Sequence, residues 1–161
     1  MEELTAYHEA GHVFVAVHSG AIVESVTIDP DWDDGPNRFG DVQIRWPAEN
    51  DDTPEELAEK RILIALAGPV AEMIFTGDPF HPAMVAEWSM DWNEAWNVTN
   101  SFIPDEKKRL KYLEQKTIQL YQLLHQDSRW ALLSMIVDHL LAHETLDSGM
   151  IEEIVSEWRV L

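Results

Sequence analysis

The chain has 161 residues, of which 45% are hydrophobic, and its formal net charge is −19. This length suits a single domain, and seven tryptophans are typical of a folded core rather than a disordered chain. The excess of acidic over basic residues disfavours a nucleic-acid partner, and the absence of cysteine excludes thiolate metal ligands and disulfides.

The sequence predicts no membrane span. Its longest apolar run, residues 62–71, is half the length of the roughly 20 residues that cross a bilayer. Glu2 and Glu3 also give the first residues the wrong charge for a secretory signal. We therefore expect a cytoplasmic protein.

Hydrophobic periodicity and turn residues divide the chain into short elements. In chain order they predict a helix over 2–19, strands over 22–28 and 39–46, and helices over 54–75, 83–100, from 106 onwards, over 128–144 and over 148–158. Gly20 is a natural end for the first helix, and Thr53, Pro54 and Glu56 are typical of a helix start.

Two segments are expected to interrupt this pattern. The Asp- and Pro-rich segment 29–37 fits no calcium-binding loop and is expected to be a turn-rich connection. Pro69 favours a bend in the helix over 54–75, and Pro79 and Pro82 mark the next loop. Together the patterns predict one mainly α domain over 1–161, with a small N-terminal β-sheet and therefore an α+β fold.

The first predicted helix carries the motif H-E-x-x-H as His8, Glu9 and His12. Residues four apart lie on one helix face, one turn apart, so both imidazoles can reach one tetrahedral zinc ion. The glutamate of this motif lies beside the metal, where a general base for water is needed. Gly11 costs about 1 kcal/mol in a helix interior compared with alanine. A close approach of another backbone segment, or of a substrate, to position 11 would explain why a glycine stands there.

The residues alone leave the third ligand open. His18 lies six positions after His12, but Val15 stands where the extended zinc motif needs a glycine to turn the chain back. The helix should therefore continue, and His18 should point away from His12. A third protein ligand must then come from elsewhere in the chain, from a His, Asp or Glu side chain, because there is no cysteine.

Several segments in the same order resemble the peptidase domain of the FtsH family of ATP-dependent zinc metalloproteases. They are Thr5–His12, Val23–Ile28, Ala67–Glu72, Ser89–Ala95 and, more weakly, Leu141–Leu146. The 161 residues contain neither the ATPase module nor the membrane anchor of that family. Ala67 replaces the first glycine of its Gly-Gly pair, and Trp92 replaces a leucine.

The resemblance implies a role for each matching residue. His8, His12 and Asp91 correspond to the three zinc ligands, and Glu9 corresponds to the catalytic base. Spacing alone does not single out Asp91, because Glu72, Glu87 and Glu94 could supply the third ligand in its place. For Glu72 two roles stay open: its carboxylate orients one imidazole, or it is a plain surface charge. A zincin-like helix carrying the motif and a Zn²⁺ cofactor follow from the same resemblance.

Three further groups are interpreted as structural. Trp88, Trp92 and Trp96 recur every four residues and are expected to pack in the core. His139 and His143 lack a glutamate after the first histidine and are expected to pack or lie on a helix surface. A basic cluster is expected to form a solvated helix face, with docking of an acidic partner as the alternative. Its residues are Lys107, Lys108, Arg109, Lys111 and Lys116.

The sequence thus predicts a zinc metallopeptidase that cleaves unfolded or flexible polypeptides without ATP. The rival hypothesis is a binding or regulatory module that keeps the fold and the metal but has no catalytic activity. A separate ATPase or another protein is a candidate partner in either case.

Overall fold

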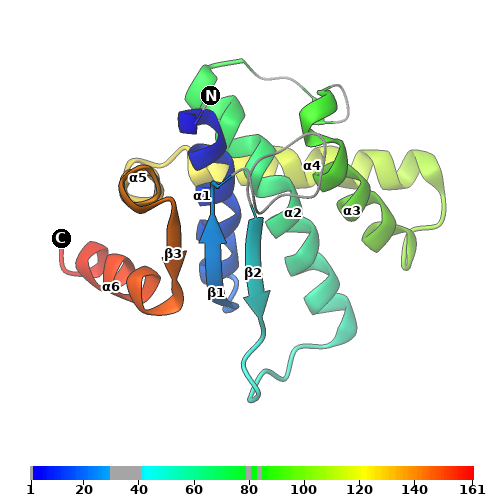
Figure 1. Ribbon diagram of the computed structural model, residues 1–161. Coiled ribbons are helices and arrows are strands. Elements are labelled where there is room, and N and C mark those ends of the chain that lie inside the picture. Colours follow the sequence, from blue (N-terminus) through cyan, green and yellow to red (C-terminus); the bar gives the residue numbers. More distant parts are fainter. Residues whose placement is uncertain (1, 30–40, 79–80, 83–84) are drawn as a thin grey trace.

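The computed structural model describes residues 2–29, 41–78, 81–82 and 85–161. The elements are α1 (Glu2–His18), β1 (Ile22–Thr27), β2 (Asp41–Arg45), α2 (Pro54–Thr76), the 3-10 helix η3 (Ala86–Trp88), α3 (Ser89–Asn100), α4 (Glu106–Leu124), α5 (Asp127–His143), β3 (Thr145–Asp147) and α6 (Ser148–Arg159) (Figure 1). They confirm the expected mainly α fold with a small sheet. The loop expected over 29–37 and the start of the strand expected at residue 39 lie almost entirely outside the described residues.

Helix α1 lies at the centre of the fold. Nearly every residue from Thr5 to Ala16 is buried, because α2, α5 and the sheet surround the helix. Figure 1 shows α1 behind strand β1. The helix ends as expected, with Gly20 at a φ of 91° and the Ala21 amide donating to the Ala16 carbonyl. The motif residues are therefore carried on the most enclosed helix of the fold.

Within the described residues the sheet has three strands, in the order β2-β1-β3. Antiparallel pairing of β1 with β2 confirms the expected pair, and Val26 lies opposite Val42. The third strand was not predicted, and it comes from the C-terminal part of the chain, so the sheet is not purely N-terminal. In it, Leu146 pairs with Val26 and is fully buried. Strand β3 has only three residues, too few for an alternating pattern to stand out.

Helix α2 begins and ends as the sequence indicates. The Thr53 hydroxyl accepts from the Glu56 amide at 3.2 Å, and Gly77 ends the helix at a φ of 78°. A bend was expected at Pro69, but α2 continues through this residue as one helix. Residues 65–73 are all buried, so surrounding elements hold this part of the helix in place. This buried segment of α2 packs against α1 and brings Gly68 and Glu72 to the motif.

Helix α3 begins later than predicted. A helix was expected from about residue 83, but Val85 is extended, η3 covers 86–88 and the α-helix starts at Ser89. Residues 83–84 lie outside the described residues. No side chain caps the start of α3 or of η3. Val85, which precedes η3, is β-branched, and such residues disfavour an earlier helical turn.

The described helices and strands share one apolar core, which includes Leu66, Leu113 and Leu140. None of the helices in the described part of the chain has the length and apolarity of a membrane-spanning segment.

Candidate metal centre

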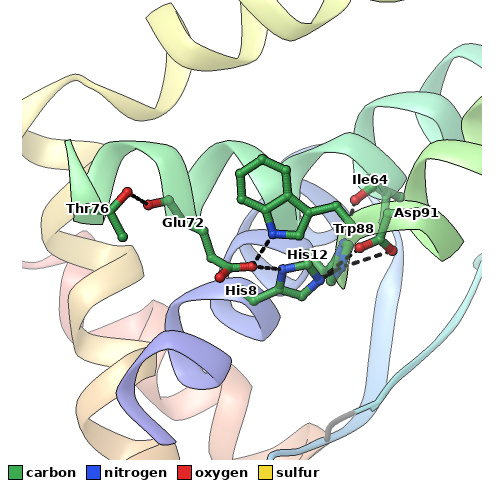
Figure 2. A network of polar contacts seen from close by, with 7 residues as sticks. All are labelled: His8, His12, Ile64, Glu72, Thr76, Trp88 and Asp91. Carbon is green, nitrogen blue, oxygen red and sulfur yellow. Dashed lines mark hydrogen bonds and ion pairs between the residues drawn. The ribbon is translucent and has the colours of Figure 1, made fainter. Parts of the chain in front are cut away.

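Side chains from α1 and α3 meet at one point (Figure 2). The Nε2 atoms of His8 and His12 lie 3.1 Å apart. Asp91 Oδ2 lies 2.8 Å from His8 Nε2, and Asp91 Oδ1 lies 3.5 Å from His12 Nε2. The two histidines are adjacent on their helix, whereas Asp91 is brought in by the packing of α3 on α2. The three side chains therefore direct two nitrogens and a carboxylate toward a common centre.

The other nitrogen of each imidazole is already committed to a hydrogen bond. His12 Nδ1 lies 2.7 Å from the carbonyl oxygen of Ile64, which only accepts hydrogen bonds. His8 Nδ1 lies 2.6 Å from Glu72 Oε2, in agreement with the orienting role considered for Glu72. Both Nδ1 atoms therefore donate, so Nε2 is the nitrogen of each ring that faces the centre and would bind a metal once it is deprotonated.

The charges around this centre favour a bound cation. Burial by itself lowers the pKa of His8, but Asp91 and Glu72 outweigh it and raise the pKa from 6.5 to about 10. Burial likewise acts to raise the pKa of Asp91, yet His12 and His8 hold it well below its usual range. Positive charge is thus strongly stabilised between the imidazoles and the carboxylates.

Gly68 clears the space in front of the two imidazoles. A Cβ atom at this position would lie 2.4 Å from His12 Nε2 and 2.7 Å from His8 Nε2. These distances are far too short for a methyl group. The missing side chain leaves a cradle beside both nitrogens. Two histidines, a carboxylate and this cradle fit a zinc ion that keeps an open position.

Glu9 lies next to the same centre. Its carboxylate and the ring nitrogens of His8 and His12 lie within 4.8 Å of one another. The side chain is buried, and burial raises the pKa of Glu9, against the opposing charges of His12 and His8. A carboxylate with a raised pKa beside the metal ligands has the properties of a general base.

Gly11 allows α1 and α2 to approach closely. A Cβ atom there would lie 2.5 Å from the Ala67 carbonyl oxygen and 2.7 Å from the Ala71 Cβ atom. The glycine is therefore explained by the close approach of the α2 backbone and not by the approach of a substrate.

The alternative ligands lie elsewhere. Glu94 pairs with Arg61 at 2.9 Å on the surface, and Glu87 is exposed. His18 stacks on Phe14 in the last turn of α1, six residues beyond His12 and so about 9 Å further along the helix. His139 and His143 stack on each other along α5, and His143 is exposed. None of these side chains belongs to the cluster.

One sequence interpretation is confirmed but incomplete, and another is wrong. Trp88 is buried as expected, but its indole nitrogen also donates to Glu72 Oε2 at 2.6 Å, a contact that the spacing of the tryptophans gave no sign of. Arg109 is not on the surface face predicted for the basic cluster. It is buried, it donates to the carbonyls of Ile103 and Pro104, and its guanidinium lies 4.4 Å from the ring centre of Trp96.

No protein-family model matches the sequence, and no curated protein matches it.

Proposed function

We propose that the chain is a zinc-dependent metallopeptidase related to the FtsH peptidase domain. In this proposal His8, His12 and Asp91 are the zinc ligands, and Glu9 is the general base. The observation that carries it is the convergence of two imidazole nitrogens, 3.1 Å apart, with a carboxylate at 2.8 Å in front of a glycine.

Zinc held by these residues would polarise the scissile carbonyl and lower the pKa of a water molecule to about 7. Glu9 accepts a proton from the attacking water as its oxygen bonds to the carbonyl carbon. Glu9 then delivers this proton to the amide nitrogen, the C–N bond breaks and the amine leaves. Glu72 holds the Nδ1 proton of His8, and the Ile64 carbonyl holds that of His12, so both rings keep their orientation throughout.

The proposed substrates are unfolded or flexible polypeptides. The site opens toward solvent at Asp91, whose side chain is 22% exposed, against 2% for His8. Strand β2 contacts α1, and among the described residues no strand pairs with its outer edge. An extended peptide could add to this edge by backbone hydrogen bonds. A separate ATPase that delivers unfolded chains would be a suitable partner.

The decisive experiment compares Glu9→Gln with the parent protein. The variant should bind one equivalent of zinc, because Glu9 is not a ligand, and should lose hydrolysis of an unstructured fluorogenic peptide by about 100- to 10,000-fold. Glu87→Gln, a change of an exposed glutamate, should leave the rate unaltered. The proposal is wrong if the zinc-loaded parent cleaves no unstructured peptide, or if Glu9→Gln cleaves at the parental rate.

A further inference from the structure

The indole of Trp88 completes a ring of contacts that links three helices and η3. Glu72 Oε2 accepts from Trp88 Nε1 at 2.6 Å and from His8 Nδ1 at 2.6 Å (Figure 2). His8 Nε2 in turn faces Asp91 at 2.8 Å, and Asp91 lies three residues after Trp88 in the chain. The backbone between Trp88 and Asp91 therefore closes the ring.

The bond from Trp88 fixes which way the Glu72 carboxylate points. Both donors share one oxygen, so the indole N–H holds that oxygen in front of His8 Nδ1. His8 then keeps a proton on Nδ1, and its Nε2 atom stays directed at the centre, where it would give up its own proton to a metal. The Trp88, Glu72 and His8 side chains are all at most 5% exposed, so water has little access to replace a lost bond.

The same bond also ties the start of α3 to α2. Trp88 stands directly before α3, where no side chain caps the helix, and α3 carries Asp91. A shift of the indole would therefore move Asp91 away from the two histidines.

We infer that Trp88 is a positioning residue of the metal site: its N–H, acting through Glu72, orients His8 and places Asp91 before zinc binds. This inference rests on the proposed zinc site. Changes in groups that orient metal ligands typically weaken metal binding about 10- to 100-fold. Trp88→Phe removes the N–H and keeps most of the ring, so we expect zinc affinity to fall about 10-fold.

Zinc affinity, measured by competition with a chelator, tests the inference without any assay of activity. Trp158→Phe is the control, because it removes an indole N–H that donates to the Ser128 carbonyl on the other side of the fold, and it should leave zinc affinity unchanged. A second comparison separates the hydrogen bond from packing. In a Glu72→Ala background the N–H has lost its acceptor, so adding Trp88→Phe should weaken zinc binding less than about twofold.

An equal loss from Trp88→Phe in both backgrounds would mean that the ring acts by packing alone, and would overturn the inference. So would an unchanged affinity in the single variant.

If Glu72→Ala does not fold, 3-benzothienylalanine at position 88 has the shape of the indole but no N–H, and it should reproduce the loss seen with Trp88→Phe. Parental affinity with this residue would also overturn the inference. A parent that binds zinc but hydrolyses nothing would refute the peptidase proposal alone, whereas a parent that binds no zinc would refute both.

Discussion

Gly68→Ala is the sharpest test of where the metal sits, because it adds one methyl group without removing a ligand. The added Cβ atom would lie 2.4 Å from His12 Nε2 and 2.7 Å from His8 Nε2. An ordinary contact is at least 3.4 Å, so the two nitrogens would have to retreat by about 1.0 and 0.7 Å. Metal–ligand distances tolerate only about 0.2 Å. The methyl group would also fill the cradle itself.

We therefore expect Gly68→Ala to weaken zinc binding by more than about 100-fold, beyond the range of changes that only reorient a ligand. The metal-free fold should be affected much less. Overpacking costs about 1–3 kcal/mol, and alanine in place of a helical glycine returns about 1 kcal/mol, so the net loss should be at most about 2 kcal/mol. Zinc affinity would be measured by chelator competition, and metal-free stability by urea unfolding.

Gly149→Ala is the matched control. It also replaces a helical glycine, but its Cβ atom would lie 3.4 Å from Asp147 Oδ1, an ordinary contact. This variant should bind zinc like the parent. Parental zinc affinity in a folded Gly68→Ala variant would show that the ion does not lie between the two Nε2 atoms.

Three further predictions concern the ligands, the helix packing and the substrate. Asp91→Ala should lower zinc affinity more than about 100-fold, while His18→Ala should leave it unaltered. Metal analysis that shows zinc loss from His18→Ala and not from Asp91→Ala would make His18 the third ligand. Gly11→Ala should destabilise the metal-free protein by up to about 2 kcal/mol in urea unfolding, because an overpacking cost of about 1–3 kcal/mol outweighs a gain of about 1 kcal/mol in helix propensity. The Ala67 carbonyl is backbone and cannot rotate away, so an unchanged midpoint would contradict this packing. The zinc-loaded protein should cleave a permanently unfolded protein and spare its native form, whose global opening costs about 5–15 kcal/mol, with no response to ATP. Equal cleavage of both forms, or cleavage only with ATP, would refute this.

The arrangement of His8, Glu9 and His12 follows from the sequence alone, because helical periodicity decides it. Four residues complete slightly more than one turn, so the two imidazoles must share a face wherever the helix lies. The ends of most elements were predictable for a similar reason, since local chemistry sets them: Thr53 caps α2, and Gly20 ends α1.

The remainder of the site depends on tertiary packing. From spacing, Asp91 was one of four possible carboxylates, and only the packing of α3 against α2 brings it to 2.8 Å from His8. Strand β3 forms because β1, about 120 residues earlier in the chain, offers it an edge, and a three-residue segment has no pattern of its own. The bond from Trp88 to Glu72 and the space left by Gly68 are contacts between different elements. Local periodicity carries no information about such contacts, because they arise only when those elements pack together.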